Sequence, residues 1–182
     1  MSDRFLWLDQ LLVNLDHCGS EGGAALKYMR DHRVKVSFHD QSTAARWTFD
    51  RRLELHPRYA DSAPDAAYPL SLIIHEVKHL QQGFFTALSV FGELEAWQLQ
   101  FSFLKSFTGS YHSNRKSNEI IQELMLLPLN GNRDALIQAR QLMQAYAGKQ
   151  YRADLLPLYP LPKELMFNLF RREFGSDNRL QK

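Results

Sequence analysis

The chain has 182 residues, of which 45% are hydrophobic and 23% are charged, and 22 Lys and Arg against 20 Asp and Glu leave a formal net charge of +2. This length and apolar content predict one globular domain over residues 1–182, and the balanced charge argues against electrostatic binding to nucleic acid. No apolar run is long enough to cross a membrane, the amino terminus does not resemble a signal peptide, and the single cysteine, Cys18, excludes an intramolecular disulfide, so we expect a cytoplasmic protein without membrane contacts.

The first third of the chain predicts two helices followed by three short strands. Apolar residues recur at helical spacing in residues 3–17, and a second helix is expected over residues 24–32 after a glycine-rich stop. Hydrophobic and polar residues then alternate in three segments, each of which predicts a strand. These segments are residues 34–38, 46–49 and 52–55. We expect the last two strands to form a hairpin with a tight turn at residues 50–51.

The rest of the chain is predicted to be helical after a polar loop at residues 57–69. Helices are expected at residues 69–82, 89–107, 117–127, 132–147 and 162–174, several of them followed by a glycine. A polar loop at residues 108–116 and a proline-rich, extended segment at residues 156–162 connect some of these helices. The pattern predicts an α+β domain with a small three-stranded sheet in the amino-terminal half and a mostly helical carboxy-terminal half.

One motif carries chemistry: residues 75–79 read His-Glu-Val-Lys-His, inside the predicted helix 69–82. Positions i and i+4 of a helix lie on one face, so His75 and His79 can bind one Zn²⁺ while Glu76 lies beside the metal as a general base. The hairpin that precedes this helix provides an edge strand that can pair with an extended peptide. The motif therefore predicts a zinc site next to a peptide-binding edge.

A catalytic zinc site needs a third protein ligand, for which Glu93, Glu95 and His112 are the downstream candidates. Within the predicted helix 89–107, helical phasing places Glu93 on the apolar face and Glu95 on the opposite, polar face. A carboxylate on an apolar face is costly unless it is paired or bound to a metal, so Glu93 is favoured as the ligand. The aromatic side chains at residues 84–107 are expected to pack in the core.

The HEVKH motif followed by Glu-Leu-Glu-Ala at residues 93–96 resembles the gluzincin branch of the zinc metallopeptidases. The resemblance covers about residues 45–107 and implies a zincin-like fold in which a glutamate on the next helix, here Glu93, is the third zinc ligand. Trp97 stands where the family often has an aspartate that orients a histidine ligand. Gln100, on the inward side of the same helix, is a candidate to replace it.

The resemblance implies a metallopeptidase that hydrolyses peptide or amide bonds in a peptide or protein substrate. Zinc held by the two histidines and Glu93 would lower the pKa of a bound water, and Glu76 would take its proton and pass it to the leaving amine. Tyr111 and His112, in the loop after the Glu93 helix, are the candidates for stabilising the oxyanion.

Two further hypotheses remain open from the sequence. The chain could be a zincin-fold binding or regulatory domain with little or no turnover, which the missing aspartate at position 97 favours and the intact Glu76 opposes. The extended, apolar segment at residues 156–162 could also lie in the cleft as an internal pseudo-substrate.

Overall fold

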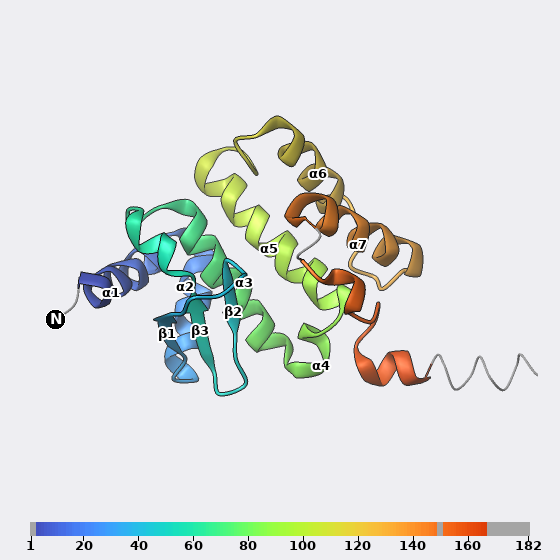
Figure 1. Ribbon diagram of the computed structural model, residues 1–182, viewed down its shortest axis with the longest axis horizontal. Helices are drawn as coiled ribbons and strands as arrows, with labels where there is room; N and C mark the ends of the chain where they lie inside the picture. Colours follow the sequence, from blue (N-terminus) through green and yellow to red (C-terminus); the bar gives the residue numbers. More distant parts are fainter. Residues whose placement is uncertain (1–2, 149–150, 167–182) are drawn as a thin grey trace, which may run out of the picture.

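A small mixed sheet packs on one side of a larger array of helices in the computed structural model, which describes residues 3–148 and 151–166 (Figure 1). The elements in chain order are α1 (Asp3–Asp16), α2 (Gly19–Asp31), β1 (Lys35–Phe38), β2 (Ala45–Trp47), β3 (Arg52–Leu55), the 3-10 helix η1 (Pro57–Asp61), α3 (Ala67–Gln82), α4 (Phe84–Ala87), α5 (Val90–Thr108), α6 (Arg115–Met125), α7 (Arg133–Ala147) and the 3-10 helix η2 (Ala153–Leu155). The predicted α+β class is confirmed. Residues 161–166 are helical, and the rest of the helix predicted at residues 162–174 lies outside the described residues.

The sheet has the strand order β1-β3-β2, with β1 parallel and β2 antiparallel to β3. Arg46 of β2 lies opposite Glu54 of β3, and its guanidinium contacts the Glu54 carboxylate at 2.6 Å. Such a cross-strand pair supports this register of the hairpin. Because β3 is the central strand, β2 is an edge strand, and α3 packs beside it.

The hairpin turn is one residue longer than the sequence predicts. The Thr48 carbonyl accepts the N–H of Arg51 at 3.0 Å, and the Thr48 N–H donates to the Arg52 carbonyl at 2.9 Å, which leaves a three-residue loop at residues 49–51. Arg51 has a φ of 58°, the left-handed conformation that closes loops of this length. The Asp50 carboxylate accepts hydrogen bonds from Thr48 and Arg52 and holds the loop together.

The predicted break after the first helix is present before Gly19, but Gly22 and Gly23 lie inside α2 and do not belong to it. α2 already begins at Gly19. A Cβ atom at Gly22 would lie 2.3 Å from the Leu15 carbonyl oxygen of α1, so glycine is needed here for the two helices to approach each other. No helix of the described residues has the length and hydropathy needed to cross a membrane.

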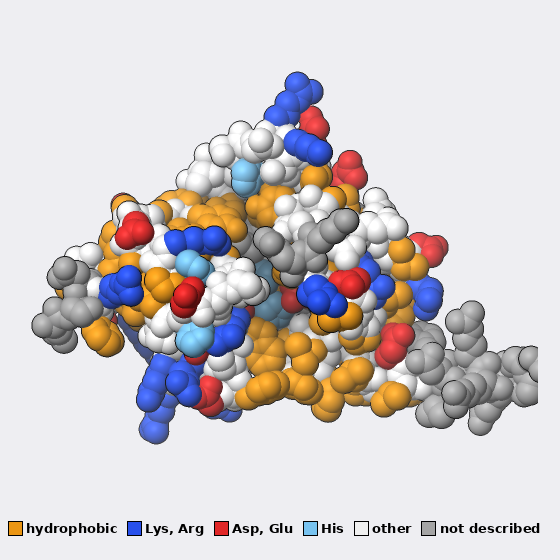
Figure 2. All heavy atoms as spheres, viewed as in Figure 1, with side chains coloured by type: hydrophobic (Ala, Val, Ile, Leu, Met, Phe, Trp, Pro, Cys, Tyr) orange, Lys and Arg blue, Asp and Glu red, His pale blue; other side chains and the backbone are white. Residues whose placement is uncertain are grey.

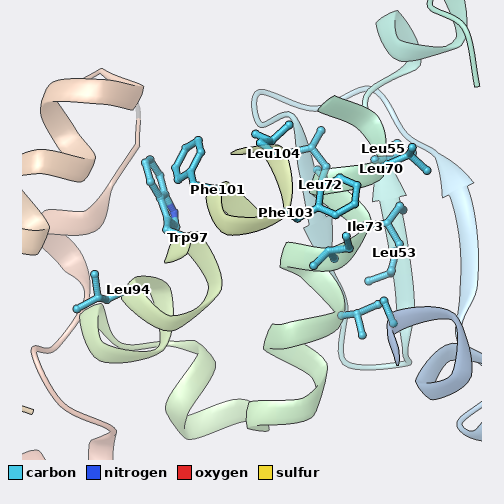
Figure 3. Close-up of a cluster of buried hydrophobic side chains, with 14 of the residues drawn as sticks. Leu53, Leu55, Leu70, Leu72, Ile73, Leu94, Trp97, Phe101, Phe103 and Leu104 are labelled. Carbon is cyan, nitrogen blue, oxygen red and sulfur yellow. The ribbon is translucent and has the colours of Figure 1, made fainter. Parts of the chain in front are cut away.

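α3 lies at the centre of the fold and is buried along most of its length. It packs along α5 on one side and against β2 and β3 on the other. Figure 3 shows the α3 side chains between Leu53 and Leu55 of β3 and the aromatic side chains of α5. Each fully buried Leu or Ile contributes about 1.5–3 kcal/mol. This two-sided packing fixes which face of α3 is turned toward α5.

The proline-rich segment after α7 packs on the amino-terminal end of α5. The N–H of Val90 donates to the Pro157 carbonyl at 2.9 Å, and the N–H of Phe91 donates to the Leu158 carbonyl at 3.1 Å. These carbonyls satisfy N–H groups that the first turn of a helix leaves unpaired. Leu158 is itself buried. The segment therefore supports α5, which corrects the hypothesis that it lies in the cleft as a pseudo-substrate.

Candidate metal centre

Three side chains of metal-ligating type come together between α3 and α5. His75 and His79 lie one helical turn apart on α3, and Glu93 lies in the first turn of α5. One ligand atom of each lies within 4.8 Å of the others, and no second group of this kind occurs within residues 3–148 and 151–166. The histidines are 8% and 2% exposed, so the group is enclosed by protein.

The separations between these atoms suit a tetrahedral zinc site. The Nε2 atoms of His75 and His79 are 3.0 Å apart. Glu93 Oε2 lies 3.7 Å from His75 Nε2, and Glu93 Oε1 lies 3.6 Å from His79 Nε2. Zinc bonds of about 2.0–2.2 Å in a tetrahedron place neighbouring ligand atoms about 3.3–3.6 Å apart. The observed separations bracket that value, so the three side chains fit a zinc ion with little adjustment.

The other two candidates for the third ligand lie elsewhere. Glu95 accepts a hydrogen bond from Gln82 at 2.9 Å and lies 3.7 Å from the ammonium of Lys78. His112 packs its ring against Tyr146 with 5.9 Å between centroids. Neither joins the histidine pair of α3, whereas Glu93 does. The phase argument that separated Glu93 from Glu95 agrees with this placement.

Burial and mutual charge set the protonation of the three side chains in the metal-free protein. Burial, and then the charge of His79, lowers the pKa of His75 to about 3. Burial also opposes the charged forms of His79 and Glu93, but their attraction outweighs it, so the pKa of His79 is raised and that of Glu93 is lowered. Glu93 is therefore ionised, as a metal ligand must be, and His75 is neutral.

Gln82, at the end of α3, orients His79. Its Nε2 donates to the Gly92 carbonyl at 2.8 Å and to the Glu95 carboxylate at 2.9 Å, so its Oε1 is an acceptor. This oxygen lies 3.0 Å from His79 Nδ1, which must then carry a proton. The neutral imidazole consequently has its lone pair on Nε2, the atom that faces His75 and Glu93. Gln82 thus gives His79 the tautomer that a metal ligand requires.

Gln100 lies beside His75, as expected for a residue that orients this histidine. It is buried, and its Nε2 donates to Ser71 Oγ at 3.2 Å. Gln100 and the backbone of Ala96 both act on the ring of His75 in the direction that raises its pKa. The Nδ1 atom of His75 is nevertheless buried without a partner at hydrogen-bond geometry.

Tyr151 is a residue of the site that sequence analysis missed. Its hydroxyl donates to Glu93 Oε2, across 58 positions of the chain. The indole N–H of Trp97 in turn donates to the Tyr151 oxygen at 2.9 Å. Trp97 was a signal, because its indole N–H needs a partner when it is buried, but nothing in the sequence connects it with Tyr151. The two residues predicted to stabilise the oxyanion make other contacts. The Tyr111 hydroxyl accepts a hydrogen bond from Lys105, and the ring of His112 packs against Tyr146.

Glu76 lies on the side of α3 that faces the sheet, and only 6% of it is exposed. Burial, together with the charge of Glu93, raises its pKa to about 7, although the charge of His79 and a hydrogen bond from the backbone of Trp47 act in the opposite direction. The Trp47 contact ties the carboxylate to the edge strand β2. A carboxyl group with a pKa near neutral can both accept and release protons under physiological conditions.

A row of aromatic rings leads from the site to the surface, which corrects the expectation that all aromatic side chains in residues 84–107 pack in the core. Trp47 lies 6.4 Å from the His79 ring and 5.5 Å from Phe49, and Phe49 lies 5.0 Å from Phe84. Phe49 is 75% exposed and Phe84 is 40% exposed. Figure 2 shows hydrophobic side chains gathered along this edge of the molecule, near the hairpin turn and α4.

No protein-family model, curated protein or solved structure matches this chain.

Proposed function

We propose that the protein is a zinc-dependent metallopeptidase of gluzincin type that hydrolyses peptide or amide bonds. The observation that carries the proposal is the convergence of His75, His79 and Glu93, at separations that suit zinc, next to the buried carboxylate of Glu76. Two imidazoles and one carboxylate favour zinc and leave a fourth position open. When bound, zinc would act as a Lewis acid and lower the pKa of a water molecule at the site.

Glu76 is suited to move the proton that hydrolysis requires. The attacking water must lose a proton as its oxygen bonds to the carbonyl carbon, and the amine must gain one as the carbon–nitrogen bond breaks. The Glu76 carboxylate, buried beside the ligand group, can accept the first proton and deliver it in the second step. The adjacent His75 and the backbone of Trp47 fix its place between the ligand group and β2.

The surroundings of the site favour a peptide as the substrate. β2 is an edge strand beside α3, and an edge strand can pair its backbone with an extended chain. The aromatic row of Trp47, Phe49 and Phe84 begins at His79 and would accommodate apolar side chains of that peptide. A small charged substrate would gain little from such a surface.

Zinc content with matched ligand variants tests the proposal. We expect one zinc per chain by elemental analysis in the wild-type protein and in Glu95→Ala, and loss of zinc in His79→Ala and Glu93→Ala. Glu95→Ala is the matched control because it removes a carboxylate outside the ligand group, while Gln82 keeps its hydrogen bonds to the Gly92 carbonyl and to His79. Retention of zinc in Glu93→Ala, or no zinc in the wild-type protein, would contradict the proposed centre.

In the zinc-loaded protein, Glu76→Gln should keep the metal and lower peptide hydrolysis at least about 100-fold. Zinc binding without hydrolysis by the wild-type protein would instead favour a binding or regulatory domain.

A further inference from the structure

A chain of two hydrogen bonds leads to Glu93, with Trp97 as the donor to Tyr151 and Tyr151 as the donor to the Glu93 carboxylate. An indole N–H can donate but cannot accept, so the Tyr151 oxygen is the acceptor of the Trp97 bond at 2.9 Å. The single hydroxyl proton of Tyr151 is then directed to Glu93 Oε2. An aspartate at position 97 could not donate in this way while it is ionised. Tryptophan at this position therefore directs the Tyr151 hydroxyl proton toward the Glu93 carboxylate.

The aromatic surroundings of Tyr151 keep this donor in place. Its ring packs edge-on against Trp97 at 5.3 Å, and Trp97 is packed in turn against Phe101 at 5.6 Å and Tyr146 at 5.3 Å. The rings leave the hydroxyl little freedom to turn away.

The same segment of chain also holds the backbone of the helix that carries Glu93. Beyond Tyr151, the carbonyls of Pro157 and Leu158 accept the N–H groups of Val90 and Phe91, in the first turn of α5. Glu93 is thus fixed twice, through its side chain and through its helix. Both contacts come from the segment that follows α7.

We propose that Trp97 and Tyr151 are positioning residues that orient the Glu93 carboxylate as the third metal ligand. They do for Glu93 what Gln82 does for His79. The inference rests on the proposed zinc site. Partners of this kind change metal affinity about 10- to 100-fold, and Tyr151 is expected to act through the metal's affinity and not through contact with the substrate.

Zinc affinity of Tyr151→Phe, measured by competition with a chromophoric chelator, tests this role. The variant removes one oxygen and keeps the ring, so we expect the dissociation constant to rise about 10- to 100-fold while the thermal midpoint of the metal-free protein changes little. Tyr146→Phe is the matched control. It removes a hydroxyl from a ring that also packs on Trp97 but interacts with Tyr68, so its zinc affinity should equal that of the wild-type protein.

Trp97→Phe and cobalt substitution provide a second readout. Trp97→Phe retains Tyr151 but removes the donor that orients its hydroxyl, so its affinity should fall between those of the wild-type protein and Tyr151→Phe. The visible spectrum of bound Co²⁺ should change in Tyr151→Phe and not in Tyr146→Phe. A wild-type protein that binds zinc, with unchanged affinity and spectrum in Tyr151→Phe, would overturn this role alone. A wild-type protein that binds no zinc would overturn the metal centre and the inference together.

Discussion

A single residue of the candidate site, Glu76, makes the stability of the fold depend on pH. Folding raises the pKa of this carboxyl from 4.5 to about 7, chiefly through burial. A group with a raised pKa contributes its full stability below the unfolded value, and that contribution is lost as the pH rises through the folded value. At a pH between the unfolded and the folded pKa, this carboxyl is mostly ionised in the unfolded chain and mostly protonated in the folded one. Rising pH therefore favours unfolding.

We therefore predict that metal-free Glu76→Gln is more stable than the metal-free wild-type protein at about pH 8, by about 2–3 kcal/mol. The difference should vanish near pH 4, where the carboxyl is protonated in both states. Urea denaturation of chelator-treated proteins at the two pH values measures it. Equal stability at the higher pH would mean that the buried carboxylate is compensated in the folded protein.

The way in which α5 packs against the segment after α3 determines where Glu93 lies. Gly92 precedes Glu93, and a Cβ atom there would lie 2.0 Å from the Thr86 carbonyl oxygen and 3.1 Å from Gln82 Oε1. The Gly92 carbonyl also accepts the Gln82 hydrogen bond. The close approach of α5 to the segment after α3 thus brings Glu93 to the histidines and Gln82 to His79.

Gly92→Ala should force the first turn of α5 away from residue 86, at a cost of about 1–3 kcal/mol, and should weaken zinc binding. Gly23→Ala is the control, because it also adds a methyl group to a helical glycine but meets no atom within 4 Å. That variant is expected to be neutral or to stabilise α2 by up to about 1 kcal/mol. Thermal denaturation and chelator competition report the two effects. A Gly92→Ala protein as stable as the wild type would show that α5 can shift without loss.

The carboxy-terminal segment couples distant parts of the chain at the scale of the whole molecule. It carries Tyr151 to Glu93 and places Leu158 in the core, against the start of α5. Leu158 is 6% exposed, whereas Leu155 in the same segment is 65% exposed. Substituting each leucine in turn therefore distinguishes the effect of losing a buried side chain from the effect of changing any residue of this segment.

Leu158→Ala is predicted to lower the free energy of unfolding by about 2–5 kcal/mol. Leu155→Ala should change it by less than about 0.5 kcal/mol. Zinc affinity should fall with Leu158→Ala and stay constant with Leu155→Ala, since the first variant loosens the segment that holds α5. Urea denaturation and chelator competition on both variants test the coupling. Equal effects of the two substitutions would contradict it.

Much of the fold and the candidate site could be predicted where the pattern is local. Spacing of apolar residues located the three strands and most of the helices, although not α4 or the first turn of α2. The i, i+4 spacing of His75 and His79 placed both imidazoles on one face of α3. Helical phase also separated Glu93 from Glu95, because an amphipathic helix exposes one face and buries the other. Gly22 was misinterpreted, since its role is contact with another helix.

Local patterns in the sequence were enough to predict most of the elements, the HEVKH motif and Glu93 as the favoured ligand candidate, because each depends on residues within a few helical turns. Only the tertiary structure decided that β3 lies between β1 and β2, that Trp47 meets Glu76, and that Tyr151 reaches Glu93. Each of these contacts joins residues far apart in the chain, where no periodicity or spacing relates them. They arise from burying α3 on two sides at once, which only the packing of the whole molecule can specify.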